Sequence, residues 1–308
     1  PEARRLDWAG LVTFSASMFL LVFGLVRGNV NGWSSHTIVS CFAGAALLML
    51  LFVAAELRQQ RPMFDLSLFR SPPFLGVSLA TFAMGAGMFA LLPYITLYLQ
   101  NELGLSPLQG GLCLLPATVP AFVIPLITRR LTARIPGGVV LGVGLVVTAL
   151  GVLLMHGLTV ASTWAALVAG AAVAGIGIGI ANPAMARIAL GVVPPQRSGM
   201  ASGISNTFRL GGVATGVAAL GAIFQDRLAS SMGNTPPGLG QRVASEGPSA
   251  VARGGGHLVM AARQAFVSST NDLFIVSVFM VMAGAVAALA LIGRRAIRPQ
   301  PVAAAAID

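Results

Sequence analysis

Arg209 is the one ionisable side chain deep inside an apolar stretch of this sequence, ten residues after the stretch begins at Gly199. A charge in hydrocarbon is costly, so an intramembrane arginine is a functional candidate by default. Asn206 precedes it by three residues, on the same face of a helix, where its amide could bind the guanidinium group or a ligand. The alternative is structural: Arg209 extends to the membrane surface or bonds to carbonyl groups of a neighbouring helix.

Two pairs of side chains at helical spacing are candidates for binding a flat or apolar ligand. Met84 and Met88 are four residues apart, as are Tyr94 and Tyr98. Methionine adapts its shape to varied ligands, and aromatic rings stack on cations. The alternative is that the methionines face lipid or the core and that Tyr98 lies at the outer interface, where tyrosine is common. We take Met84, Met88 and Tyr94 as candidate substrate contacts.

The residues needed for enzymatic chemistry are not placed for it. An intramembrane hydrolase needs a nucleophile and a base at mid-depth, whereas His36, His156 and His257 are expected in outer loops. Cys41 and Cys113 each lie in an apolar stretch without a nearby histidine or carboxylate, which indicates buried free thiols rather than a disulfide or a metal site. The sequence therefore argues against an enzyme, and we expect no metal and no cofactor.

These candidates must be positioned by membrane-spanning helices, because 56% of the 308 residues are hydrophobic and only 9% are charged. About 20 apolar residues cross the hydrocarbon core. The sequence predicts an all-α, polytopic membrane protein with eight spans: Trp8–Val26, Ile38–Ala55, Phe74–Leu99, Leu108–Thr128, Val139–Met155, Thr163–Ala186, Gly199–Phe224 and Leu273–Ile292.

The arginines predict the orientation of these spans. All 19 basic residues are arginine, and the net charge is +10. If the spans alternate in direction, 13 arginines fall on one side of the membrane and five on the other. Four of those five lie in one long loop, and Arg209 lies within a span. Positive loops are retained in the cytoplasm. We therefore expect both termini to be cytoplasmic, and we attribute the basic charge to topology rather than to nucleic-acid binding.

Several motifs resemble one family. MFDLSLFR at Met63–Arg70 precedes a span that ends in PYITLYLQNELGLSPLQGGLCLLP at Pro93–Pro116. VPPQRSGMASGISNTFRLGGVATGVAALGAIF at Val193–Phe224 is followed by a long loop and a final span. This combination resembles the fourteen-span drug:proton antiporters of the major facilitator superfamily, over about Arg5 to Arg295. The family's usual glutamine after the seventh-span arginine is Leu210 here.

The resemblance implies how the chain is organised. Residues 1–57 are similar to the two-span insert between the transporter halves, 58–73 to a cytoplasmic linker, and 74–293 to the C-terminal six-helix bundle, followed by a cytoplasmic tail at 294–308. The outer loop 225–272 is expected to be flexible up to Gly256, with a short surface helix at His257–Val267. The first residue is Pro1, and the six N-terminal spans of the family do not precede it, so we expect a piece of a longer protein.

The resemblance also identifies helix breaks and a cytoplasmic loop. Gly- or Pro-interrupted segments at matching places of two repeats mark a transporter's binding site. Small residues also serve close helix packing, which is the alternative. Arg129, Arg130 and Arg134 are similar to the C-half copy of the superfamily's cytoplasmic signature loop, where arginines pair with carboxylates across the two halves; the alternative is topology charge alone. The expected gating or helix-break residues are Gly85, Gly87 and Pro93 in the third span, and Gly175, Gly177, Gly179 and Pro183 in the sixth.

Three functions remain open at this point. The first is the C-terminal portion of a proton-driven pump in the inner cell membrane that exports hydrophobic or cationic compounds by alternating access. The second is a dedicated exporter of an endogenous metabolite or lipid, and the third is an inactive half-transporter fragment. Asn182, Asn206 and Arg209 would line the site and would meet lipid if the N-terminal half were missing. No carboxylate is expected at mid-depth, so the proton acceptor is expected in that half. The expected partners are the bilayer, this half, a small substrate and protons.

Overall fold

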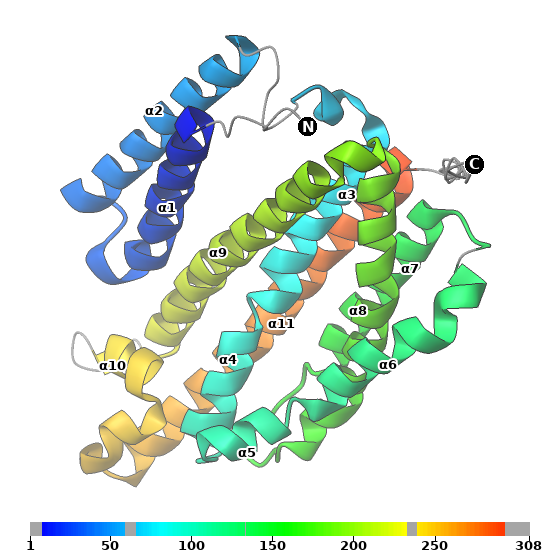
Figure 1. The fold of residues 1–308 in the computed structure, drawn as a ribbon. Helices are drawn as coiled ribbons and strands as arrows, with labels where there is room; N and C mark the ends of the chain where they lie inside the picture. The colour runs from blue at the N-terminus through cyan, green and yellow to red at the C-terminus, as the bar shows by residue number, and fades with distance from the viewer. Residues whose placement is uncertain (1–7, 59–65, 133, 233–238, 293–308) are drawn as a thin grey trace, which may run out of the picture.

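The computed structural model describes residues 8–58, 66–132, 134–232 and 239–292, which are coloured in Figure 1. Among these residues, eight helices are long and apolar enough to cross a membrane. This confirms the predicted all-α, eight-span class. The candidate spans are Gly10–Asn29, His36–Arg58, Pro72–Glu102, Pro107–Arg129, Gly137–Leu154, Ala165–Gly191, Pro195–Ser231 and Gly256–Ile292.

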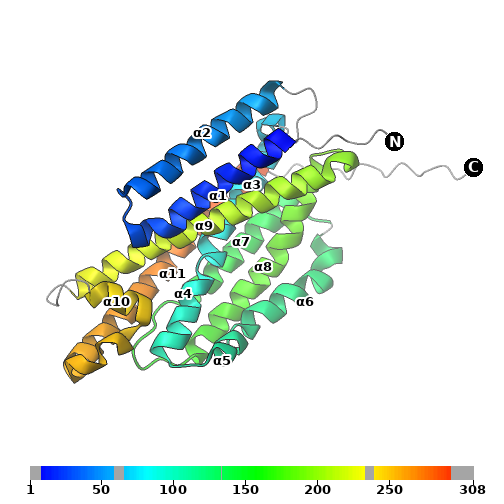
Figure 2. The same cartoon turned by 60° about the vertical axis from the view of Figure 1, so that its left-hand side comes forward.

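The first two helices form an antiparallel hairpin beside the remaining bundle (Figure 2). Helix α1 (Trp8–Asn31) turns at Gly32, whose φ of +84° suits glycine, into α2 (His36–Arg58). The Ser17 hydroxyl donates a hydrogen bond of 2.8 Å to the Ala45 carbonyl and so ties the two helices together. Helix α1 also packs on α9 (Ser198–Ser231), where Asn29 Nδ2 donates to the Ala218 carbonyl at 2.9 Å.

The third span is not a uniform α-helix. It consists of α3 (Pro72–Met84), the π-helical turn η2 (Gly85–Phe89), α4 (Leu92–Leu97) and a second π-helical turn, η3 (Tyr98–Glu102). Within η2 the Ala90 amide donates to the carbonyl of Gly85, five residues earlier. Pro93 lies in the first turn of α4, where its missing N–H costs little. π-Turns of this kind are frequent at functional sites.

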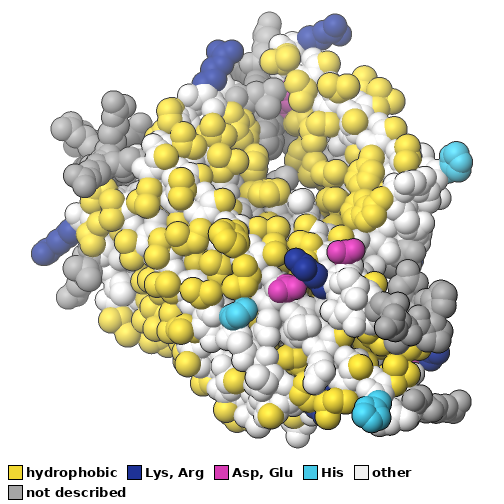
Figure 3. All heavy atoms as spheres, turned by 180° about the vertical axis from the view of Figure 1, so that it is seen from behind, with side chains coloured by type: hydrophobic (Ala, Val, Ile, Leu, Met, Phe, Trp, Pro, Cys, Tyr) yellow, Lys and Arg dark blue, Asp and Glu magenta, His cyan; other side chains and the backbone are white. Residues whose placement is uncertain are grey.

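The remaining spans complete two layers (Figures 1 and 2). In front lie α9, the third span, α8 (Ala165–Gly191) and α6 (Leu115–Thr132), which the short α5 (Pro107–Leu112) precedes. Behind them lie α7 (Gly137–Leu154) and α11 (Gly256–Ile292). Buried residues such as Leu141, Leu145 and Ala181 fill the space between the layers. Seen from behind, much of the upper and middle surface is hydrophobic, and a few charged side chains lie near the middle of the view (Figure 3).

Small residues let these helices approach closely. A Cβ atom on Gly151 would overlap the Ala174 backbone, which brings α7 against α8. A Cβ on Gly212 or Gly216 would overlap carbonyl groups of Phe82 or Ala86, which brings α9 against the third span. Close backbone approach between small residues is a common way for membrane helices to associate, because lipid supplies no hydrophobic drive for it.

The segment after Phe224 differs from the expected flexible loop. Helix α9 continues to Ser231, and the chain then forms α10 (Leu239–Glu246) and the 3-10 helix η5 (Pro248–Gly254). His257–Val267 is helical, as expected, but it is the first part of the long helix α11 and not a short separate surface helix. Ala262 and Phe266 are buried, with the Phe266 ring edge-on to Phe224 at 5.2 Å between centroids. This apolar contact extends the last helix beyond the predicted span.

We name the two ends of the bundle by their sequence. The arginine-rich end is the end at which α2, α6 and α8 finish and α3 and α9 begin; the loop end is the opposite one, where α10 lies (Figure 1). The arginines described at the arginine-rich end are Arg58, Arg70, Arg129, Arg134, Arg187 and Arg197.

Candidate functional site

Arg209 and Asn206 lie on α9 and are not enclosed by this chain. Asn206 is exposed and Arg209 is half-buried, and the neighbouring Leu210 is also exposed. Among the residues that the structure describes, no carboxylate pairs with Arg209; the ion pairs found there join Arg227 to Asp272, Arg242 to Glu246 and Arg263 to Glu102. An unpaired guanidinium group at depth in a membrane bundle is a candidate contact for a ligand or for another helix.

Asn182 adds an uncompensated polar atom at a similar depth. It lies nine residues before the end of α8, and Asn206 and Arg209 lie eight and eleven residues after the start of α9. At about 1.5 Å per residue, all three are roughly 12 to 17 Å from the arginine-rich end. The Oδ1 atom of Asn182 is buried and accepts no hydrogen bond from the described residues. A buried acceptor without a donor among the described residues is unfavourable.

The first π-turn lies directly against the turn of α9 that carries Arg209. A Cβ atom on Gly85 would overlap the carbonyl oxygen of Arg209, so only glycine fits there. Gly87 packs on the other side, against α11, where a Cβ would lie 2.8 Å from the Ser277 carbonyl. The structure therefore brings Gly85 and Arg209 together through the backbone and places the helix irregularity between α9 and α11.

The other third-span candidates are less accessible. Met84 and Met88 are buried inside this bundle, which is the packing alternative of the sequence analysis. Tyr94 is half-buried and donates its hydroxyl to the Val217 carbonyl at 2.8 Å, next to the bond from Asn29 to Ala218. Gly221 leaves the space for both groups, because a Cβ there would lie 2.8 Å from each. Tyr94 thus joins α4 to α9, next to the bond by which Asn29 joins α1 to α9.

The expected break in the sixth span is absent. Helix α8 runs without interruption through Pro183. Its glycines instead mark packing: a Cβ on Gly175 would overlap the Ala117 carbonyl of α6, and one on Gly177 would overlap the Thr148 backbone of α7. Gly179 faces α6, with Ile124 at 3.0 Å from a Cβ. Here the packing alternative accounts for the glycines.

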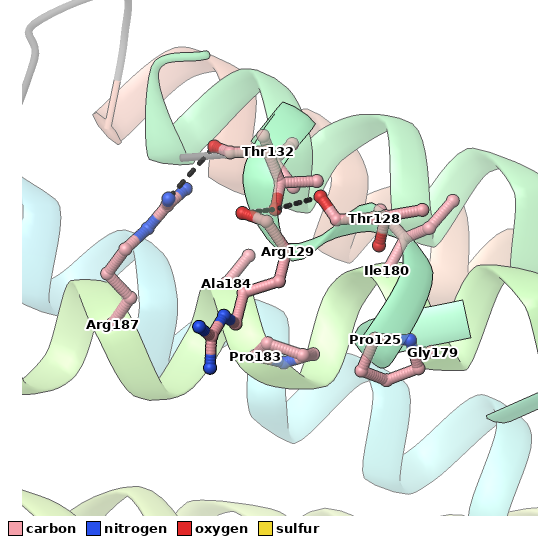
Figure 4. A pocket seen from close by; sticks show the side chains of 10 residues that line it. Pro125, Thr128, Arg129, Thr132, Gly179, Ile180, Pro183, Ala184 and Arg187 are labelled. Atoms are coloured by element: carbon pink, nitrogen blue, oxygen red, sulfur yellow. Dashed lines mark hydrogen bonds between the residues drawn. The ribbon is translucent and has the colours of Figure 1, made fainter. Parts of the chain in front are cut away.

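The signature-loop arginines border a small cavity at the arginine-rich end (Figure 4). Arg129 is on α6 and lines this cavity, whereas Arg134 is exposed just after α6 and the side chain of Arg130 lies outside the described part of the structure. Arg187 on α8, which the sequence analysis counted only as topology charge, also lines it and donates a hydrogen bond of 2.9 Å to the Thr132 carbonyl.

Sequence reasoning missed a buried ion pair at the loop end. Glu102, the last residue of η3, has 1% of its side chain exposed and accepts a bond of 2.7 Å from Arg263 Nε of α11. Arg263 is 34% exposed, and the second carboxylate oxygen of Glu102 is buried without a partner in the described residues. The helical spacing of His257–Val267 could have indicated the pair. In a helix, Arg263 lies close to the face that carries Ala262 and Phe266.

The architecture defines a multi-pass helical membrane protein with polar side chains exposed on one layer. Among the described residues, no group of three or more His, Cys, Asp or Glu side chains could hold a metal ion. Residues 77–229 match the Major Facilitator Superfamily. This matched segment belongs to the superfamily, whose members are transporters rather than enzymes.

Several curated proteins are similar to the chain. A "probable actinorhodin transporter" of Streptomyces coelicolor is 38% identical over 245 residues, covering 75% of this chain and 41% of that protein. The "multidrug efflux pump LfrA" of Mycolicibacterium smegmatis is 30% identical over 302 residues, covering 92% and 58%. The "tetracenomycin C resistance and export protein" of Streptomyces glaucescens is 27% identical over 231 residues, covering 73% and 42%. The chain thus spans about half the length of these relatives.

Among solved structures, the chain is similar in fold to a bacterial homologue of the human lysosomal transporter Spinster, in an inward-facing and unoccupied conformation. The two are 18% identical with a TM-score of 0.47, and the match covers 91% of this chain and 69% of that one.

Proposed function

We propose that the chain is the C-terminal portion of a proton-driven efflux transporter that exports hydrophobic or cationic compounds by alternating access. In this proposal the arginine-rich end is cytoplasmic, the protein spans the inner cell membrane, and a six-helix N-terminal half completes the transporter. The names of the similar proteins, which include exporters and resistance proteins, support an export function.

The side chains of the front layer are the main observation that supports this proposal. Asn182, Asn206 and Arg209 lie there at one depth, with polar atoms that no residue in the described part of the chain satisfies. On α6, Phe122 is 79% and Leu126 80% exposed, so this helix also leaves a large apolar surface uncovered. A second bundle against this layer would bury the apolar surface and enclose the polar groups. Alternating access needs such a second bundle, which rocks against the first around a shared site.

Proton coupling is assigned to the absent half because of where the acidic residues lie. Among the described residues, Glu102, Asp226, Glu246 and Asp272 lie towards the loop end and Glu56 towards the arginine-rich end. A coupling carboxylate is expected near mid-membrane, where hydration and substrate change its proton affinity. In this half Arg209 would then act electrostatically, repelling a cationic substrate or pairing with the acid of the other half.

A reconstitution experiment tests this proposal. We expect the purified chain alone to insert into liposomes and to show no ethidium efflux and no proton exchange. Co-expression with the six-span N-terminal half of its parent gene should restore proton-dependent efflux, with an N-half lacking its mid-membrane carboxylates as the control. Proton-coupled efflux by the chain alone would contradict both the half-transporter assignment and the placement of the proton acceptor.

A dedicated exporter is the second candidate. It is favoured by the 38% identical relative, whose name specifies one compound rather than many drugs. A transport panel separates the two: a multidrug pump would move chemically unrelated cations, whereas a dedicated exporter would move one compound class. A completed transporter that moves none of the panel would support the inactive-fragment alternative.

A further inference from the structure

The cavity at the arginine-rich end has a polar rim and an apolar floor. Its volume is about 200 Å³, and it lies between α6, α7 and α8. Two arginines and two threonines form the polar part, namely Arg129, Arg187, Thr128 and Thr132. Val140 and Ile180 are among the residues of the apolar part. Figure 4 shows Arg129 extending beside Pro183 and Ala184 while Arg187 reaches Thr132.

The cavity exists because α6 and α8 touch at two separate places. Towards mid-membrane, Gly175 and Gly179 bring the two helices into close contact. At the rim, the Arg187 guanidinium group is bonded to the Thr132 carbonyl and bridges them again. Between these contacts, Pro125 and Pro183 lie inside their helices and line the cavity.

The two guanidinium groups lack a counter-ion. In the part of the chain that the structure describes, no ion pair involves Arg129 or Arg187, and no acidic side chain lines the cavity. Arg187 commits one donor to Thr132, which leaves several of its five N–H groups free. Guanidinium groups bind phosphate oxygens with two parallel hydrogen bonds, and this geometry favours a phosphate group over a halide.

We propose that this cavity binds the headgroup of an anionic phospholipid, with the phosphate held by Arg129 and Arg187 and an acyl chain along the apolar floor. The combination of charge and apolar surface at one end of a membrane bundle fits an amphipathic ligand, because a free anion would leave Val140 and Ile180 unused. Basic pockets between membrane helices on the cytoplasmic side have this chemistry. The site is separate from the polar groups of the front layer.

Lipid binding to the purified chain tests the proposal. The probes are phosphatidylglycerol, phosphatidylcholine and inorganic phosphate, and bound lipid is counted by native mass spectrometry from mixed micelles. We expect phosphatidylglycerol to be retained in preference to phosphatidylcholine. The double variant Arg129→Gln/Arg187→Gln should lower its retention by roughly tenfold or more. Excess inorganic phosphate should not displace it, because phosphate cannot occupy the apolar floor.

The matched control is Arg58→Gln/Arg70→Gln, which removes two exposed charges at the same end but none from the cavity. It should retain the lipid. An equal loss in both double variants would overturn the proposal in favour of general surface charge, as would equal retention of the two lipids. Displacement by phosphate would identify a free-phosphate site instead. Removing the two charges could disturb folding, so a second variant is needed. Ala184→Phe fills the cavity and keeps both arginines. It must also abolish lipid retention, with an unchanged circular dichroism spectrum.

Discussion

At the scale of single residues, two arginines inside or near the membrane differ in whether an acidic side chain pairs with them. Arg263 is neutralised by the buried carboxylate of Glu102, whereas Arg209 has no acidic partner among the described residues. The first arrangement supports stability at the loop end. The second leaves a charge for a partner outside this chain, which is why Arg209 remains our principal functional candidate.

Arg209→Ala in the full-length transporter should reduce efflux by roughly tenfold or more, because a lost hydrogen bond to a charged group costs on the order of 2 kcal/mol. Membrane insertion should be unaffected, since removing the charge makes insertion easier. Arg209→Lys should also fail if a planar group contacts two partners. Efflux from cells and the amount of protein in the membrane are the two measurements.

The control for this prediction is Arg227→Ala, on the same helix, where the arginine pairs with Asp272 at the exposed loop end. It should transport normally. Full efflux by the Arg209→Ala variant would instead favour a structural arginine that extends to the membrane surface.

Glu102→Gln should lower the free energy of unfolding by about 2 kcal/mol, because it removes one partner of a buried pair. Arg263→Gln should cost more, since it leaves the buried carboxylate unpaired, and the double variant should recover part of the loss. Thermal unfolding in detergent, followed by circular dichroism, measures these differences. Glu246→Gln, which affects an exposed pair with Arg242, should change the free energy by less than about 0.5 kcal/mol. A Glu102 effect no larger than this would mean that the pair is not buried in solution.

At the scale of helices, the sequence predicted where the spans lie better than how they pack. The charge-free apolar runs located all eight, because crossing hydrocarbon requires length and apolarity. The outward extension of α11 was missed because its polar residues His257 and Arg263 resemble those of a loop, while burial of Phe266 depends on Phe224 forty-two residues earlier. Gly85, Gly87 and Pro93 were expected to interrupt the third span, and the first π-turn begins at Gly85. The second π-turn, Tyr98–Glu102, was not expected, since it depends on contacts with α11.

Glycine substitutions provide a test of this packing. Gly175→Ala should destabilise the chain by about 1 to 3 kcal/mol, because the added Cβ meets the Ala117 carbonyl of α6. Gly203→Ala, on α9, should be neutral or stabilise by up to about 1 kcal/mol, because nothing lies within 4 Å of its Cβ and alanine favours the helix. Thermal unfolding of both variants gives the comparison. Equal effects would mean that α6 and α8 are not in close contact.

At the scale of the whole molecule, the front layer carries polar side chains at mid-depth. Hydrophobic side chains cover much of the back, with charged side chains near the middle of the view (Figure 3), and α9 and α6 of the front layer expose Asn206 and several apolar side chains. Of the candidate site, the sequence identified Asn182, Asn206 and Arg209 by residue type. It could not show that Met84 and Met88 are buried or that α8 is continuous, because both depend on neighbouring helices.

Loop charge predicts the orientation of the whole bundle. In a variant with Cys41 and Cys113 replaced by alanine, Ser231→Cys and Ser249→Cys should react with an impermeant thiol reagent in intact cells. Ser67→Cys should react only after the membrane is permeabilised, because the arginine-rich end is retained in the cytoplasm. All three positions are exposed in the structure, so access to the side chain does not limit the reaction. Labelling of position 67 from outside would reverse the assigned orientation.

The π-turns of the third span have a geometric consequence. Each one accommodates an extra residue relative to an α-helix of the same path. If a turn moved along the helix by one position, the residues it passed would rotate by about 100° and advance by about 1.5 Å, while the hydrogen bonds on either side were kept. The segment between Gly85 and Glu102 is therefore bounded by two places where register can be exchanged. A screw-like step of this segment would alter which of its side chains face α9 without unfolding any helix.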